Sequence, residues 1–396
     1  MSDLMNENRK GKIKYFLAGA AVALTAAFLI LLLIYLAPYH SYVEDPTGLN
    51  AGKKTKEIVS YIDQYFLGET DKKNMADYMY LGLVSGLEDP YSTYFTKEEY
   101  DDVSMNQHGD YRGIGITVSN RTEDGALIVT KVTENGPSER VGILTGDLIL
   151  KINGEDFAKA DPSEVVAYIR GLDADSVELT VYRENTGEEL TFEIPMETLE
   201  DYSVKYKMMD DGIGYVYISS FTARTFEQFE EARTDLESQG MKALIVDLRG
   251  DLGGLVSAVK DVLNGFMPEG LIFYTEDKYG NRNEYFSKGE HVWDVPMAVL
   301  VNNRTASASE IFAGAVQDHE VATIIGEVTY GKGIVQNAYK LSDGSVLRIT
   351  VSHYYTPNGN DIHKAGITPD ILIENEDGKD TQYQRAVEIL KKQLNE

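Results

Sequence analysis

Cysteine is absent from the 396 residues of this chain, which excludes thiol catalysis, disulfide bonds and cysteine-ligated zinc. Histidine is scarce: the six histidines are scattered and none stands in an H-E-x-x-H pair, so we expect neither a metal nor a cofactor. Positive charge is also in deficit, with 37 lysines and arginines against 64 acidic residues. A net charge of −27, without a basic stripe beyond the N-terminus, argues against a nucleic-acid partner.

Apolar residues are plentiful, at 43% of the chain, and the length leaves room for two or three domains. Residues 15–37 carry no charge over 23 positions, long enough for a helix to span a bilayer core of about 30 Å. Four basic residues precede this run, so residues 1–14 should form a cytoplasmic tail. A cleaved signal peptide is the alternative, but its apolar region usually runs only about 7–15 residues. We predict an uncleaved, single-pass signal anchor in the cell membrane, with the rest of the chain extracytoplasmic.

Residues 38–110 are predicted to form a helical N-terminal arm. Ile58, Ile62, Tyr65 and Phe66 are spaced for one helix face, and the pattern breaks at D-P-Y-S-T-Y-F in residues 89–95. Such a face serves packing or dimerisation, and we expect a homodimer formed through this arm.

Residues 111–197 have an organisation of their own. A glycine-punctuated strand entry comes first, followed by a strand at 127–132 and by G-D-L-I-L-K-I-N-G at 146–154, a strand that ends in a tight Asn-Gly turn. A generic β-rich domain is one interpretation, but the order of elements resembles a PDZ domain. In PDZ domains such an entry loop captures a peptide carboxylate with backbone N–H groups while the peptide adds as a strand. The corresponding residues here are Gly113, Ile114, Gly115 and Ile116.

From residue 198 to 376 the expected strands and helices alternate, which is typical of a layered α/β core. Strands are predicted at 213–218, 244–249 and 297–301, and a helix at 225–238. A terminal helix is expected within 377–396. The predicted fold is therefore mixed α/β, with the anchor, the arm and the β-rich domain preceding this core.

One turn in the core has the composition of a nucleophile site. Residues 303–310, N-R-T-A-S-A-S-E, lie between a buried strand and apolar residues at helical spacing. A serine there meets backbone N–H groups at a helix start, where negative charge is favoured. Ala306 and Ala308 flank Ser307 with minimal bulk, which leaves room for a substrate carbonyl. Taken alone, the turn is equally compatible with an ordinary serine N-cap.

A second segment supplies a candidate base. Lys332 sits between two glycines, and in an extended segment Lys332 and Gln336 would share one face, so the carboxamide could orient the amine. A lysine beside an apolar run can lose its proton and serve as the base for a serine. The alternative is a solvated turn lysine.

Together the two segments resemble the carboxyl-terminal processing peptidases, also called tail-specific proteases. In that family the nucleophile is the middle serine of S-A-S-A-S-E, and the base is the lysine of G-K-G about 25 residues later. Ser307 and Lys332 are 25 positions apart, Gln336 matches the orienting glutamine, and Thr305 replaces the first serine. Further matches lie at 82–94 (G-x-L-x-x-L-D-P-Y-S-x-Y, with Glu88 as a variation) and at 356–370 (T-P-x-G…G-I-x-P-D). Residues 354–359 and 366–370 are expected to form turns in a strand-poor segment. The resemblance covers about residues 82–370.

The resemblance also implies an oxyanion hole. The family's D-L-R-x-N-x-G-G corresponds to residues 247–254, where glycine lets the backbone approach a carbonyl. The N–H groups would come from Ala308 and from Gly253 or Gly254, between which the sequence does not choose. Asp251 stands where the family usually has asparagine, and we expect its side chain to point away because a carboxylate would oppose the oxyanion.

Other interpretations of these motifs are weaker. G-E-V-T-Y-G-K at 326–332 begins like a phosphate-binding loop, but Gly333 stands where Ser or Thr should hold magnesium, so we reject nucleotide binding. The Arg-Gly-Asp tripeptide at 249–251 follows a buried strand and is interpreted as chance. One rival function stays open, a catalytically silent PDZ scaffold that binds C-terminal peptides. A serine hydrolase with His353 or His363 as base is rejected because no second acid–base motif accompanies either histidine.

The predicted function is that of a membrane-anchored serine endopeptidase that cleaves exported proteins near their C-termini. Ser307 would attack, neutral Lys332 would accept the proton, and Gln336 would position Lys332. Its partners would be proteins or peptides with free C-termini, which the PDZ domain either docks or senses as a gate.

Overall fold

The computed structural model describes residue 31 and residues 51–376 and 378–395. Apart from Leu31, the predicted anchor at 15–37 lies outside these residues, as does the predicted cytoplasmic tail. Within the described part of the chain, no helix has the length and apolarity needed to cross a membrane. The chain divides into two compact units, Met1–Met79 and Tyr80–Glu396.

The described part of the first unit is helical, as predicted. It contains α2 (Ala51–Tyr65) and most of α3 (Lys72–Ser85), and an ion pair joins Lys72 to Asp63. No residue of α2 is buried. Ile58, Tyr61 and Tyr65 are 50%, 56% and 69% exposed, so this helix carries an uncovered apolar face.

The second unit begins with the short strand β1 (Thr93–Phe95) and helix α4 (Lys97–His108). Thr96 and Glu99 form a reciprocal cap at the start of α4, and Gly109 ends the helix with φ 89°. Strand β1 pairs antiparallel with β18 (Val346–Tyr355). The D-P-Y segment that was expected only to break the arm therefore leads into a sheet of the core.

The β-rich domain follows as one sheet with two covering helices. The sheet has the order β3-β4-β5-β7-β8, β6 pairs with β5, and a separate pair joins β2 to β9. Its core includes Leu127, Val129, Ile152 and Leu179, all 0% exposed. The elements are β2 (Asp110–Gly113), β3 (Ile116–Asn120), β4 (Leu127–Val132), α5 (Pro137–Val141), β5 (Leu148–Ile152), β6 (Glu155–Asp156), α6 (Pro162–Arg170), β7 (Ser176–Arg183), β8 (Glu188–Pro195) and β9 (Glu197–Glu200).

The core is built on a six-stranded sheet of order β10-β11-β12-β15-β16-β19, parallel except for β10. Every residue of β12 and β15 is buried, as expected for central parallel strands covered on both faces. The strands are β10 (Val204–Met208), β11 (Ile213–Ile218), β12 (Ala243–Asp247), β15 (Met297–Val301), β16 (Thr323–Gly326) and β19 (Ile371–Leu372). A 3-10 turn, η1 (Asp210–Gly212), precedes β11.

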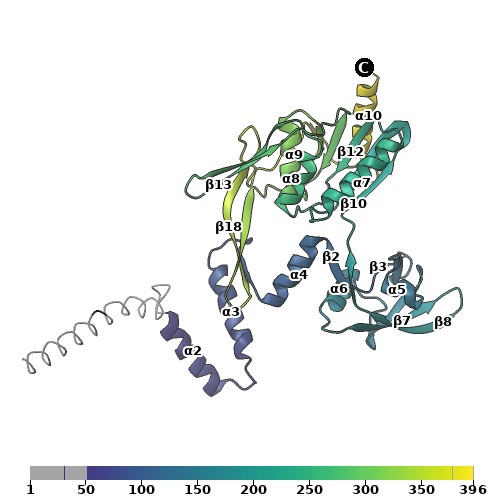
Figure 1. The fold of residues 1–396 in the computed structure, drawn as a ribbon. Coiled ribbons are helices and arrows are strands. Elements are labelled where there is room, and N and C mark those ends of the chain that lie inside the picture. The colour runs from purple at the N-terminus through teal and green to yellow at the C-terminus, as the bar shows by residue number, and fades with distance from the viewer. Residues whose placement is uncertain (1–30, 32–50, 377, 396) are drawn as a thin grey trace, which may run out of the picture. The chain divides into compact units, whose positions relative to one another are not determined.

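Helices cover both faces of this sheet. Helices α7 (Thr225–Ser238), α8 (Val256–Asn264) and α9 (Ala308–Asp318) pack on one face around Phe229, Phe266 and Phe312 (Figure 1). The terminal helix α10 (Thr381–Leu394) packs on the other face through Ala386 and Leu390.

A second sheet corrects the sequence-based prediction for the C-terminal third of the chain. The prediction placed Tyr354 in turns of a strand-poor segment, but Tyr354 belongs to β18, a strand of 10 residues, and is 2% exposed. The run V-L-R-I-T-V-S-H-Y-Y is rich in β-branched and aromatic residues, which favour a strand. Besides β1 and β18 the sheet contains β13 (Gly270–Asp277), β14 (Arg282–Ser287) and β17 (Ile334–Lys340).

Candidate active site

Three loops meet because they leave three neighbouring parallel strands at the same edge. Strand β12 leads into the glycine loop at 248–255, β15 into the serine loop at 302–307, and β16 into the lysine loop at 327–333. The carboxyl ends of adjacent parallel strands lie together, and this edge is where α/β sheets place their ligands. The topology thus brings together segments up to 85 positions apart in the sequence.

Ser307 occupies a strained turn at the start of α9. Its φ of 58° and ψ of −116° lie outside the regions that non-glycine residues favour, and such strain often accompanies function. Thr305, which replaces the family's first serine, is buried and donates its hydroxyl to the Leu248 carbonyl at 2.9 Å. The serine loop is therefore tied to the end of β12.

Glu310 links the serine loop to the lysine loop. Its carboxylate is 0% exposed, and Oε2 accepts hydrogen bonds from the N–H groups of Ser307 and Lys332, both at 2.8 Å. Oε1 accepts from the Thr329 hydroxyl at 2.6 Å and from the Gly331 N–H at 2.7 Å. One side chain thus fixes both predicted catalytic segments, and the sequence analysis assigned it no role.

The same contacts explain the likeness of residues 326–332 to a phosphate-binding loop. The N–H groups of Gly331 and Lys332 and the hydroxyl of Thr329 do converge on an anion, but that anion is the carboxylate of Glu310. Nests of successive N–H groups bind anions in general. The loop's anion site is filled from within the chain, which agrees with the rejection of nucleotide binding.

Lys332 is half-buried, and its Nζ lies 4.7 Å from the centre of the Tyr91 ring. Burial lowers the pKa of Lys332 from 10.5, and the nearby guanidinium of Arg348 lowers it further, while Glu310 and Asp89 act in the opposite direction. Over the described residues, no hydrogen bond joins Nζ to Ser307. The environment of Lys332 thus favours the neutral amine, and the ring of Tyr91 lies against the amine nitrogen.

Gln336 has a different partner from the one predicted. Its side-chain Nε2 donates to Thr350 Oγ1 at 3.1 Å, and a register shift between Val335 and Gln336 interrupts the β17–β18 ladder. The N–H of Thr350 in turn donates a hydrogen bond to Ser92 Oγ at 3.1 Å. An orienting contact with Lys332 stays a prediction.

The glycine loop lies directly against Ser307. Gly253 has φ 97°, and a Cβ there would fall 2.8 Å from the Ala308 nitrogen and 2.8 Å from the Ser307 Cβ, so only glycine fits. Its own N–H donates to Asp251 Oδ1 at 2.7 Å. The N–H of Gly254 has no hydrogen-bond acceptor within the described part of the chain, so of the two glycines Gly254 has the unoccupied donor.

Asp251 was expected to point away from the oxyanion, and its side chain lies within the glycine loop. Its side chain is 0% exposed and bonds the loop's Gly253 N–H. An aspartate side chain in a turn often accepts a hydrogen bond from the main-chain N–H two residues later. Here that bond, from the Gly253 N–H, holds the Asp251 carboxyl group inside the protein.

Tyr354 is a further residue that sequence analysis missed. Tyr354 lies on β18 of the second sheet, and its hydroxyl donates a hydrogen bond to the Ser307 carbonyl at 2.9 Å. Burial raises the pKa of Tyr354 well above its ordinary value, so the hydroxyl keeps its proton and remains a donor. This hydrogen bond holds the carbonyl group of Ser307 in place.

The predicted PDZ loop lines a groove in its own domain. Gly113, Ile114, Gly115 and Ile116 bound a cavity of about 270 Å³ whose other wall includes Val165 and Ile169 of α6. The Ile114 carbonyl accepts from both the N–H and the hydroxyl of Ser138, and the Gly115 carbonyl accepts from the Thr133 N–H. The loop is therefore fixed by its carbonyls.

The histidine and Arg-Gly-Asp interpretations gain no support from the observed contacts. The rings of His353 and His363 meet edge to face with their centroids 5.2 Å apart, and within the described residues neither histidine forms a hydrogen bond with Ser307. In the Arg-Gly-Asp tripeptide, Arg249 is paired with Asp247 and Asp380, and Asp251 is buried, so the tripeptide is not displayed.

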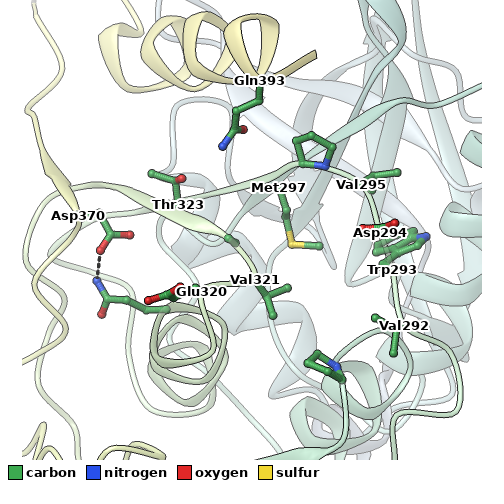
Figure 2. Close-up of a pocket in the computed structure, with 14 residues that line it drawn as sticks. Val292, Trp293, Asp294, Val295, Met297, Glu320, Val321, Thr323, Asp370 and Gln393 are labelled. Carbon is green, nitrogen blue, oxygen red and sulfur yellow. Dashed lines mark hydrogen bonds between the residues drawn. The ribbon is translucent and has the colours of Figure 1, made fainter. Parts of the chain in front are cut away.

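A cavity of about 700 Å³ in the core domain contains none of the predicted catalytic residues (Figure 2). Trp293, Asp294 and Glu320 line it, and Gln393 reaches in from α10. Gln317 donates to Asp370 at 2.8 Å, as the dashed line in Figure 2 shows. Its polar groups offer no nucleophile paired with a base.

Comparison with known proteins agrees with the geometry. The sequence profile of peptidase family S41 matches residues 212–373, and that of the PDZ domain matches residues 128–183. The carboxy-terminal processing protease CtpB of Bacillus subtilis (strain 168) is 33% identical over 330 residues, which cover 82% of this chain and 68% of that protein. The chain belongs to peptidase family S41. It is a serine-type peptidase with a PDZ domain.

Two further S41 relatives extend the comparison. A carboxyl-terminal-processing protease of Synechocystis is 33% identical over 320 residues, covering 78% of this chain and 75% of that protein. A solved structure from Bacteroides fragilis, assigned to the S41 proteases, shares the fold with a TM-score of 0.52 at 16% identity, covering 83% of this chain and 92% of that one.

Proposed function

We propose that this S41 peptidase is a membrane-anchored, extracytoplasmic endopeptidase that cleaves exported proteins near their C-termini, with Ser307 as nucleophile and Lys332 as base. One observation carries the assignment of residues. The single carboxylate oxygen Oε2 of Glu310 accepts the N–H groups of both Ser307 and Lys332, each at 2.8 Å. Two residues anchored on one atom cannot lie far apart, which supports a Ser–Lys pair.

The proposed reaction proceeds through an acyl-enzyme. Ser307 Oγ attacks the scissile carbonyl carbon, and its proton passes to the neutral Nζ of Lys332. The tetrahedral intermediate expels the amine of the C-terminal fragment, which takes that proton, and an ester remains on Ser307. Water, giving its proton to Lys332, then hydrolyses the ester and frees the serine.

Protonation of Lys332 decides whether this reaction runs. At its ordinary pKa of 10.5, only about 0.1% of a lysine would be neutral at pH 7.5. Burial and the charge of Arg348 both lower the pKa of Lys332. These effects support a base that becomes neutral at a lower pH than a free lysine does.

Backbone N–H groups would hold the oxyanion. Ala308 is the first residue of α9, where N–H groups have no helical acceptor, and Gly254 donates to no acceptor in the described chain. We assign the pair Ala308 and Gly254 to the oxyanion hole, with Gly253 as the glycine that permits the close approach. Gln336 would steady the lysine loop from β17.

The PDZ domain is proposed to recognise the free C-terminus of the substrate, either to dock it or to gate the catalytic site. Its groove beside Gly113–Ile116 has the glycine-rich entry and apolar wall that suit a terminal carboxylate and an apolar last residue.

The first residues of the chain are proposed to anchor it. The uncharged run 15–37 behind a basic segment supports a signal anchor with the N-terminus in the cytoplasm. Full-length protein should then require detergent for extraction, whereas a chain beginning at Ala51 should not. The exposed face of α2 supports a homodimer, and Ile58→Asp should lower the mass measured by sedimentation.

Cleavage of an unstructured protein, followed by mass spectrometry of the new ends, tests the catalytic assignment. Ser307→Ala should abolish cleavage, whereas Ser309→Ala, which changes a buried hydroxyl without a hydrogen bond, should keep most of it. Lys332→Arg should be inactive because arginine stays protonated. Activity remaining in Ser307→Ala refutes the assignment, and a wild type that cleaves nothing but binds C-terminal peptides would instead be the PDZ scaffold.

A further inference from the structure

Asp251 joins the glycine loop to the serine loop. Its side-chain Oδ1 accepts the Gly253 N–H at 2.7 Å, and its main-chain carbonyl accepts the Ala306 N–H at 2.9 Å. The carboxyl group is 0% exposed. A single residue therefore fixes the turn that presents Gly254 and the residue that precedes the nucleophile.

The second carboxyl oxygen of Asp251 is unused. Oδ2 is buried and finds no hydrogen-bond partner among the described residues, and the same holds for the neighbouring Ser309 Oγ. A buried carboxylate that accepts only one hydrogen bond is poorly compensated for its loss of hydration, whereas a neutral carboxylic acid or amide needs less compensation. The site suits a neutral group better than a carboxylate.

The charged and titratable groups around Asp251 do not compensate it either. Arg249, in the same loop, is occupied by Asp247 and Asp380, and Glu310 of α9 is bonded to the lysine loop. Tyr217 of β11 is a titratable side chain whose pKa the charge of Asp251 helps to raise.

We propose that Asp251 is a positioning residue of the oxyanion hole: its uncharged form holds the Gly253–Gly254 turn for the oxyanion, and its anionic form opposes the oxyanion. This inference rests on the proposed Ala308 and Gly254 pair. Either form accepts the Gly253 N–H and so keeps the turn in place. Only the anion adds a second negative charge beside the one that develops in the transition state.

The two ionisations then act against each other. Burial raises the pKa of Asp251 to about 7, although its hydrogen bond with the Gly253 N–H lowers it in part. Asp251 is thus neutral below that pH and anionic above it, whereas Lys332 is neutral only at higher pH. Asp251 is not among the groups that shift the pKa of Lys332, so the two limbs of the pH profile are separable.

Two variants of Asp251 separate its charge from its hydrogen bond. In Asp251→Asn the amide oxygen can accept the Gly253 N–H and the amide nitrogen can donate to Ser309, without charge. We expect kcat at pH 9 to rise at least about tenfold over wild type, and the ratio to fall toward one as the pH drops below 6. In Asp251→Ala the acceptor is lost, and kcat should fall about tenfold or more at every pH with a smaller change in KM.

Thermal unfolding in the Ser307→Ala background gives a readout without activity. A folded-state pKa raised from 3.8 to about 7 makes the acid destabilising once it ionises, so its cost grows between those two pH values and is constant above. The gain in Tm from Asp251→Asn should therefore be absent near pH 4, increase up to about pH 7 and then level off.

The outcomes decide the inference. If Asp251→Asn loses kcat as Asp251→Ala does, the carboxylate itself is needed and the inference is overturned. It is also overturned if kcat and Tm of Asp251→Asn differ from wild type by a constant at all pH. Cleavage by Ser307→Ala, measured in the same series, would instead refute the proposed nucleophile, so the two failures are distinguishable.

Discussion

The amine nitrogen of Lys332 lies over the ring of Tyr91, 4.7 Å from its centre. Tyr91 belongs to the D-P-Y segment between α3 and β1, so this segment packs against Lys332 as well as leading into a strand of the sheet. The contact acts on the lysine in two opposite ways. Its bulk keeps water away, which lowers the pKa of Lys332, and its ring face attracts the ammonium form, which raises it.

Substitutions of Tyr91 should separate these two effects. Tyr91→Leu keeps apolar cover but removes the ring, so the pKa of Lys332 should fall, and the rise of kcat/KM with pH should begin about half a unit lower. Tyr91→Ala admits water and should move the rise to higher pH. The measurement is the pH dependence of kcat/KM on one peptide, with Tyr91→Phe as the control that keeps the ring. Shifts of the Leu and Ala variants in the same direction would contradict the argument.

Arg348 should tune the same lysine through its charge. The guanidinium lies over the Phe95 ring at 4.9 Å and lowers the pKa of Lys332 by repelling its protonated form. Arg348→Met removes the charge and keeps most of the packing, so the pKa of Lys332 should rise and activity at pH 7.5 should fall several-fold, with recovery at pH 9 or above. Arg348→Lys, which keeps the charge, should stay near wild type. An unchanged pH profile in Arg348→Met would show that the two cations do not interact.

Glu310 should be required for the alignment of both catalytic segments. A glutamine has one acceptor oxygen, whereas the carboxylate accepts four donors, so Glu310→Gln must leave some of them unpaired in a buried place. We expect about 2–3 kcal/mol of lost stability and a fall in kcat of about a hundredfold at temperatures where the variant is folded. Thermal unfolding and kcat are the measurements, and Glu327→Gln in the same lysine loop is the matched control. A fully active Glu310→Gln would show that the shared carboxylate does not set the geometry.

Strongly patterned segments were predictable from sequence. Strand β15 and helix α7 were predicted at the bounds observed, because an uninterrupted apolar run and a clear helical period leave few alternatives. Composition and spacing predicted Ser307 and Lys332 as a pair, and the parallel sheet brings the loops that carry them to one edge. Glu310 could have been found as well, since serine followed three residues later by glutamate is a capping pattern.

The contributions from the second sheet could not be predicted. Tyr91, Arg348 and Tyr354 reach the site through antiparallel pairings whose register the sequence does not reveal, and the register shift at Gln336 is invisible for the same reason. The burial of Asp251 could not be predicted, because the local bond to the Gly253 N–H that keeps its carboxyl group inside is not visible in the sequence. Buried polar groups follow their hydrogen-bond partners, and those partners are set by the fold.

Recognition of a terminal carboxylate by the PDZ groove is the remaining test. The groove beside Gly113–Ile116 is walled by Val165 and by Val166, which is 42% exposed and so accessible to a peptide side chain. Calorimetry with the inactive Ser307→Ala chain should show peptides with a free C-terminus binding about tenfold or more tightly than their amides, because hydrogen bonds to a charged acceptor are the stronger ones. Val166→Asp should weaken binding of the peptide with a free C-terminus, because it places a like charge beside the peptide carboxylate. Glu189→Gln should not weaken this binding, because Glu189 lies on β8, at the other end of the sheet from β3. Equal affinity for acids and amides would remove terminal docking from the proposed function and leave the Ser–Lys chemistry untouched.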